Sequence, residues 1–166
     1  MTELLLSLHV LAAIVTVGSV TVAASMFPRY ALKACAVDAA GADAGSGGRS
    51  AAIATVLHRV CSGYAVAGVA VPVLGIATGA QLGVLTDTWL IASLILTLAA
   101  AVLLGLAVLP AQRRLLDLAA TPSSPGRWTS ARPMAARIAM LTGIFNLLWA
   151  IVVVLMIVRP GSTTSA

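Results

Sequence analysis

The sequence predicts an all-α membrane protein, a bundle of four transmembrane helices in one domain. The chain of 166 residues is 60% hydrophobic and only 9% charged, whereas soluble domains carry about 25% charged residues. Four apolar stretches are each long enough to cross a bilayer core, which takes about 20 residues as a helix. Nine of the ten basic residues lie in only two of the gaps between these stretches. The chain therefore requires an apolar solvent, the lipid bilayer.

The first predicted span covers residues 4–26. It is preceded by Glu3 and by no Lys or Arg, whereas a signal peptide has a basic start and an apolar core of about 7–15 residues. We therefore expect a retained helix. The other spans are predicted at 60–82, 89–109 and 138–158. Pro72 lies in the middle of the second span and should kink it.

The connectors at 27–59 and 110–137 hold the basic residues. Because Lys and Arg concentrate in cytoplasmic loops, both connectors are predicted to be cytoplasmic and both termini extracytoplasmic, in a plasma membrane. The short connector around 83–88 contains Asp87 and no basic residue, which agrees with an outer position.

The two basic connectors differ in composition. Residues 38–50 are rich in glycine, which predicts a flexible loop. Residues 121–133 include three prolines, which should not continue a helix. Residues 111–120 keep an amphipathic spacing, so the third helix is expected to extend beyond the membrane.

Small and polar residues should mark the faces on which the helices pack, because the hydrophobic effect does not drive helices together in lipid. The second span has such a stripe at every fourth position, with Gly63, Gly75 and Gly79 in it. Asn146 in the fourth span is expected to form an interhelical hydrogen bond. The predicted inward faces are His9, Ala12, Ala13, Thr16, Ser19 and Ala23 in the first span, and Ala135, Ala139, Thr142, Gly143, Asn146 and Ala150 in the fourth.

His9 is the clearest candidate for chemistry, because ionisable groups at membrane depth are costly and are functional candidates by default. Three roles stay open for it: a ligand of haem or copper, a proton-handling group, or a neutral histidine bonded to a neighbouring helix. His9, Met156 and Asp87 all fall toward the outer face and form the candidate copper set. His58 lies near the opposite face and is expected to be a solvated interface residue.

Several classes of function find no support in the sequence. There is no glycine-rich phosphate loop, no HExxH and no GxSxG motif, and the two cysteines form no CxxC. Aromatic residues make up 4% of the chain, too few to provide a stacking surface for nucleic acid. We therefore interpret the net charge of +5 as a signature of membrane topology and expect no nucleic-acid partner.

Three segments of the chain resemble a family of small bacterial integral membrane proteins of unknown function, loosely similar to the copper-resistance CopD domain. They are LLLSLHVLAAIVTVGS (4–19), TWLIASLILTLAAAVLLGLAVLPAQRRL (88–115) and VVVLMIVRPG (152–161). The resemblance implies a four-helix bundle in a bacterial plasma membrane, with no known activity. A weaker resemblance is to HemJ-type protoporphyrinogen oxidases, in which a histidine near the start of the first helix is taken as a haem ligand. His9 is the matching position, although residues 16–18 lack the aromatic side chain of that family.

The leading expectation is a non-enzymatic accessory or assembly subunit that acts in the bilayer through helix–helix contacts, with other subunits or with copies of itself. This role needs no cofactor. The alternative is a protein that handles haem b or copper through His9.

Overall fold

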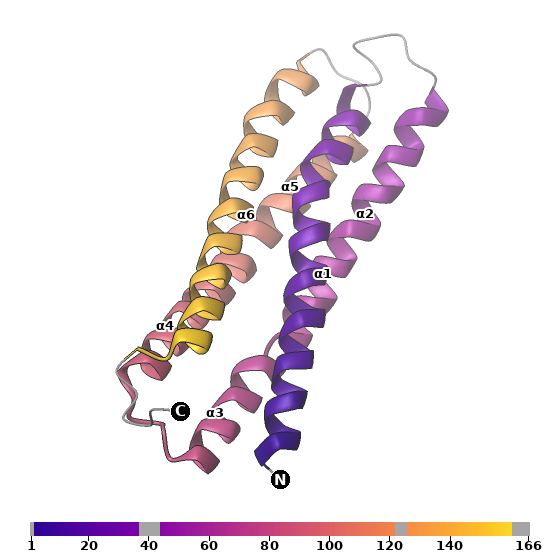
Figure 1. The fold of residues 1–166 in the computed structure, drawn as a ribbon. Coiled ribbons are helices and arrows are strands. Elements are labelled where there is room, and N and C mark those ends of the chain that lie inside the picture. The colour runs from indigo at the N-terminus through magenta and orange to yellow at the C-terminus, as the bar shows by residue number, and fades with distance from the viewer. Residues whose placement is uncertain (1, 37–43, 122–125, 161–166) are drawn as a thin grey trace.

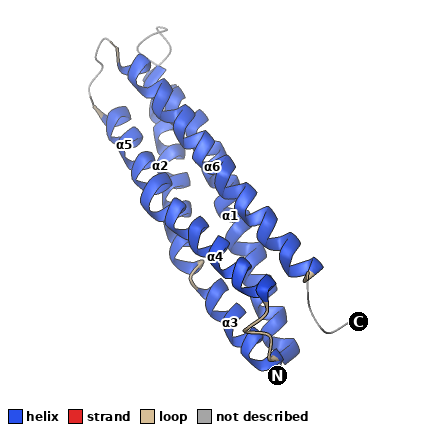
Figure 2. Ribbon diagram, turned by 90° about the vertical axis from the view of Figure 1, so that its left-hand side faces the viewer, coloured by secondary structure: helices blue, strands red, loops and turns tan. Residues whose placement is uncertain are grey.

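The computed structural model describes residues 2–36, 44–121 and 126–160. Four helical runs in it are long and apolar enough to cross a membrane: Glu3–Ala36, Ser46–Leu82, Thr88–Ala120 and Arg127–Val158. They lie side by side in one elongated bundle (Figure 1), and the described residues contain no strand (Figure 2). The predicted all-α bundle of four membrane helices is confirmed.

The elements are α1 (Thr2–Ala36), α2 (Ala44–Ala67), α3 (Ala70–Leu82), α4 (Thr88–Val102), the π-helix η1 (Leu103–Val108), α5 (Leu109–Ala120) and α6 (Arg127–Val158). α2 and α3 form one membrane run, and α4, η1 and α5 form another. α1 packs against α2, α3, α5 and α6, and α4 packs against α6. α1 starts and α6 finishes at the same end of the bundle, here named the terminal end. The opposite end, where α1 and α5 finish and α2 and α6 start, is named the basic end (Figure 1).

The helices continue well past the predicted spans at the basic end. α1 runs to Ala36, α2 starts at Ala44 and α6 starts at Arg127, so most of the predicted connectors 27–59 and 110–137 is helix. With 35 residues, α1 is about 50 Å long, against about 30 Å for a hydrocarbon core. Hydropathy indicates only the part of each helix that lipid covers. The parts of the helices beyond the predicted spans pack against one another around a separate buried core. That core consists of Phe27, Ala31, Cys35, Ala54, Leu115, Ala131, Ala135 and Ile138.

Two predictions for the connectors are wrong. Residues 44–50 of the glycine-rich segment are helical, and Gly47 is buried there, so packing overrides the low helix propensity of glycine; residues 38–43 lie outside the described residues. Of the three prolines expected not to continue a helix, Pro133 lies inside α6, where the carbonyl of Thr129 loses its usual donor. Both residues are exposed, so water can bond this carbonyl. Pro122 and Pro125 lie outside the described residues. The predicted extension of the third helix over 111–120 is confirmed by α5.

Pro72 interrupts the second run, as predicted. The helix stops at Gly68 and Val69 and resumes at Ala70. Pro72 has no N–H to offer to the Gly68 carbonyl, and its ring would clash with that carbonyl in a regular helix. The Gly68 carbonyl instead accepts from the Val71 N–H at 3.1 Å. The break therefore lies one turn before the proline.

A second proline accounts for the π-helix η1, which the sequence analysis did not predict. Pro110 stands at the start of α5 and has no N–H for the carbonyl four residues back, that of Leu106. Just before it, the Leu109 N–H bonds the Leu104 carbonyl five residues back. The wider π turn lets the helix pass the proline without ending.

The predicted inward face is confirmed for α1 and wrong for half of α6. In α1, Thr16 and Ala23 are buried and His9, Ala12, Ala13 and Ser19 are half-buried. In α6, Ala135 and Thr142 are buried and Asn146 is half-buried, but Ala139, Gly143 and Ala150 are exposed. Ile138 and Phe145 point into the bundle instead, because large apolar side chains are needed to fill its interior. Ile138 packs with residues of α1, α2 and α5, and Phe145 packs with residues of α1, α4 and η1.

Candidate functional site

His9 lies near the terminal end of α1 and is anchored to α3. Its Nδ1 is 3.0 Å from the backbone carbonyl oxygen of Val71. A carbonyl oxygen only accepts hydrogen bonds, so Nδ1 carries a proton and donates it. In the neutral imidazole the lone pair is then on Nε2, which has no partner among the described residues. The hydrogen bond thus fixes both the tautomer and the orientation of the ring.

The imidazole of His9 rests on Gly75. A Cβ at Gly75 would lie 3.0 Å from Cε1 of His9, so the ring occupies the space that any side chain would need. Of the other two glycines predicted to mark packing, Gly79 is also a close approach, since its Cβ would lie 2.9 Å from Cδ2 of Leu90. Gly63 is exposed, and no described atom comes within 4 Å of its Cβ position. Gly63 lies on α2, whereas Gly75 and Gly79 lie on α3, beyond the break before Pro72.

A groove of about 500 Å³ opens beside His9 between α1, α3, α4 and α6. α3 and α4 make few contacts with each other, which leaves room for it. Its wall is mainly apolar and includes Ile14, Ile76, Leu94 and Ile157, all of which are exposed on the sides of their helices. The groove therefore faces the lipid laterally. Its volume is in the usual range for small-molecule sites.

Few polar groups reach this groove, and most of them are already bonded. The hydroxyls of Ser93 and Thr97 donate to carbonyls of their own helix at 2.8 Å each. Arg159 follows the last turn of α6 with φ of 45°, and its guanidinium lies 5.6 Å from the centre of the Trp89 ring. The groove thus offers an imidazole nitrogen in its wall and a cation among its lining residues.

The structure brings together two of the three residues predicted to bind copper. His9 and Met156 both line the groove, whereas Asp87 does not. Asp87 precedes α4, and its Oδ2 accepts a hydrogen bond of 3.0 Å from Nε1 of Trp89. Among the described residues, no group of three or more His, Cys, Asp and Glu side chains could hold a metal ion.

Asn146 forms the interhelical bond that the sequence predicted. Its Oδ1 accepts from Oγ1 of Thr21 at 3.0 Å, which joins α6 to α1. This bond lies deeper in the bundle than His9 and is a packing contact.

His58 is not the solvated residue that the sequence analysis expected. It is half-buried on α2, and Nε of Arg113 donates to its Nε2 at 3.4 Å. Its Nδ1 therefore carries the proton and donates to Oε1 of Gln112 at 2.9 Å. Nε2 of Gln112 in turn donates to Sγ of Cys61 at 3.8 Å. These three hydrogen bonds, from Arg113 through His58 and Gln112 to Cys61, link α2 to α5 near the basic end.

Sequence reasoning missed Gln112 and Cys61, which are both fully buried. The signal was present in the amphipathic stretch 111–120, where Gln112 shares a face with Leu115. A buried amide needs partners, but the sequence did not indicate that His58 and Cys61 supply them.

Comparisons of the chain with protein-family models, with curated proteins and with solved structures return no match.

Proposed function

We propose that the protein is a membrane-embedded haem-binding protein in which Nε2 of His9 is the iron ligand. One observation carries this proposal. His9 donates its Nδ1 proton to the Val71 carbonyl and is left with a free Nε2 in a lipid-facing groove of about 500 Å³. Histidines that ligate metals almost always donate their other nitrogen to a carbonyl or a carboxylate in this way.

The donor set favours haem over a bare metal ion. A protein site for copper or zinc needs several side-chain donors, and the groove supplies only His9 and the thioether of Met156. Haem brings four nitrogens of its own and needs only axial ligands, for which histidine and methionine are common. Its apolar macrocycle also suits the apolar wall of the groove.

Three of the lining residues have a role in this proposal. His9 would hold the iron, and the thioether of Met156 would be a further donor to it. Arg159 supplies a cation for a carboxylate of the cofactor. Haem when bound would provide a redox-active iron; we assign no reaction to it.

The test is titration of the purified protein in detergent with haem, followed by its absorption spectrum. We expect a stoichiometric Soret band that His9→Ala abolishes or strongly shifts. His58→Ala is the matched control, because it removes the only other histidine of the chain and should leave the band unchanged. A band that is insensitive to His9→Ala, or no band at all, would rule the proposal out.

A second candidate is an accessory or assembly subunit that acts through helix–helix contacts. Small residues on exposed helix surfaces favour it: no described atom lies within 4 Å of the Cβ positions of Gly63 and Gly143. Such surfaces allow another helix to approach closely. If the protein purifies from its native membrane as a monomer without other proteins, this candidate fails.

The location that best fits the charge distribution is a bacterial plasma membrane, with the basic end in the cytoplasm and both termini outside. The test is an N-terminal fusion to a reporter that is active only in the cytoplasm. We expect no signal, and a positive signal would contradict this orientation.

A further inference from the structure

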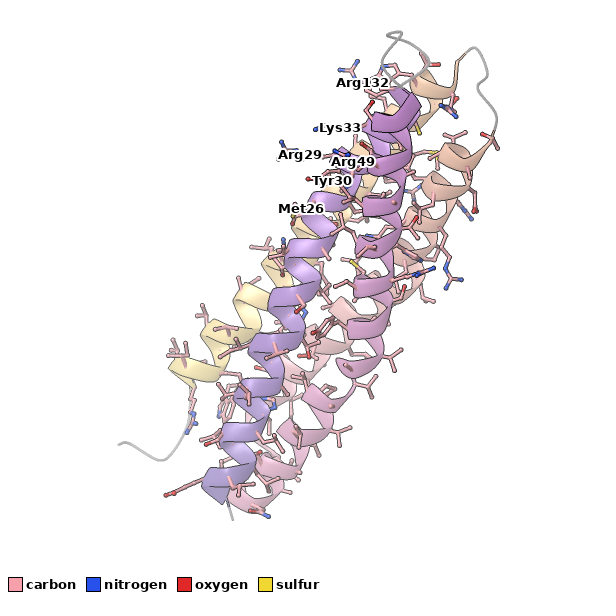
Figure 3. The ribbon with its side chains drawn as sticks, turned by 90° about the vertical axis from the view of Figure 1, so that its right-hand side faces the viewer. Met26, Arg29, Tyr30, Lys33, Arg49 and Arg132 are labelled. Carbon is pink, nitrogen blue, oxygen red and sulfur yellow. The ribbon has the colours of Figure 1, made fainter. Side chains whose placement is uncertain are left out.

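Four cationic side chains from three helices lie along one side of the basic end: Arg29 and Lys33 of α1, Arg49 of α2 and Arg132 of α6 (Figure 3). All four are exposed. The buried cluster beneath them ties α1, α2, α5 and α6 together, so the backbones that carry these side chains are fixed relative to one another. Arg29 and Lys33 are four residues apart on one face of α1, where like charges destabilise a helix.

No group in the described part of the chain neutralises these charges. None of the four side chains has a hydrogen bond or ion pair there, and Lys33 only lies over the ring of Tyr30, with Nζ 5.7 Å from its centre. The carboxylates among the described residues are Glu3 and Asp87 at the terminal end and Asp117 on α5. Among the described residues, no carboxylate therefore offsets the positive charge at this place; Asp38 and Asp43 lie outside the described residues.

A shallow hollow of about 90 Å³ lies on the α1 part of this positive surface. Met26, Arg29, Tyr30 and Lys33 line it, on successive turns of one face of α1. Met26 is the last residue of the apolar span, and Val22, one turn further into the membrane, is 59% exposed. The hollow thus lies at the level where hydrocarbon gives way to headgroups.

We propose that this hollow binds the phosphate of an anionic phospholipid headgroup. Arg29 and Lys33 supply charge and hydrogen-bond donors to the phosphate, and Arg49 and Arg132 add to the positive potential around it. Met26 and Tyr30 contact the glycerol region, and an acyl chain follows the apolar surface of α1 past Val22. Clusters of four or more Lys and Arg next to the cytoplasmic end of a membrane helix are known to bind anionic headgroups. A free phosphate has the same charge but gains nothing from the apolar surface below the hollow.

The experiment measures the lipid retained by the purified protein in mixed micelles, by native mass spectrometry. Dioleoyl phosphatidylglycerol is the probe, and dioleoyl phosphatidylcholine is the zwitterionic comparison. The variant R29Q/K33Q should bind phosphatidylglycerol about 30-fold more weakly than the parent, since each cation near an anionic headgroup contributes about fivefold. The matched control, R59Q/R114Q, removes the same charge from two exposed arginines outside the hollow and should bind like the parent.

Three outcomes would overturn the proposal. Equal retention of phosphatidylglycerol by R29Q/K33Q and the parent shows that the hollow is not the site. An equal loss in R59Q/R114Q shows that overall charge, and not this hollow, attracts the lipid. Displacement of phosphatidylglycerol by an equal concentration of inorganic phosphate shows that the site takes a free anion. Both substituted pairs are exposed, so the variants should fold, and circular dichroism of each checks this.

Discussion

At the residue scale, the hydrogen bond from His9 to Val71 determines which imidazole nitrogen is left without a partner. A histidine free to rotate would expose either nitrogen, whereas this one exposes Nε2 and uses Nδ1 for α3. The sequence identified His9 and placed it on the packing face of its helix, because polar residues at membrane depth are few. The sequence could not show that His9 bonds the Val71 carbonyl and packs against Gly75. Both residues lie on α3, whose direction depends on the break before Pro72.

We expect Gly75→Ala to weaken haem binding by about 10- to 100-fold, the usual cost of disturbing the partner that orients a metal-ligating histidine. The new Cβ would lie 3.0 Å from Cε1 of His9 and push the ring off the Val71 carbonyl. The measurement is the haem affinity from the Soret titration. Gly63→Ala is the matched control, because no described atom lies within 4 Å of its Cβ position. Equal affinities for the two variants would show that Gly75 does not position His9.

At the element scale, prolines and glycines determine how the long helices deviate from regular geometry. Pro72 breaks the second run, and Pro110 is passed by a π turn. The sequence predicted the first effect because Pro72 lies in the middle of a span. It did not predict that α2 starts at Ala44 or that Pro133 is helical, because the buried cluster at the basic end stabilises these segments and cannot be seen from local composition.

We expect Gly68→Ala to destabilise the bundle by about 1–3 kcal/mol, the usual cost of overpacking. Its Cβ would lie 3.2 Å from Cγ2 of Thr16 and 3.1 Å from the carbonyl oxygen of Tyr64. The free energy of unfolding in mixed detergent micelles is the quantity to measure. Adding Thr16→Ser removes that methyl group and should restore part of the loss. A single variant as stable as the parent would show that α1 does not approach the break between α2 and α3 as closely at Gly68 as in the structure.

At the scale of the whole molecule, the separation of charge between the two ends was predictable, and the groove was not. Both predicted basic connectors meet at one end of the bundle because an even number of crossings separates them (Figure 1). The groove results from how far α3 and α4 stand apart, and this depends on the packing of both helices against α1 and α6. No periodicity in the sequence carries that information.

This arrangement predicts the accessibility of single cysteines in oriented vesicles. Gly48→Cys and Thr121→Cys, near the two connectors of the basic end, should react with a membrane-impermeant maleimide from the same side, and Leu85→Cys from the other. The native Cys35 and Cys61 are buried and should react slowly. Labelling of Gly48→Cys and Thr121→Cys from opposite sides would contradict the bundle.

The lateral opening of the groove also determines what a ligand must compete with. Exposed apolar side chains of four helices form its rim, so in a bilayer acyl chains fill the space whenever no cofactor does. A ligand that binds in the groove then displaces lipid acyl chains from it. The relevant concentration is therefore the mole fraction of the ligand in the membrane. Apparent affinity should consequently change with the length and saturation of the surrounding lipids, even though none of them touches His9 when the cofactor is bound.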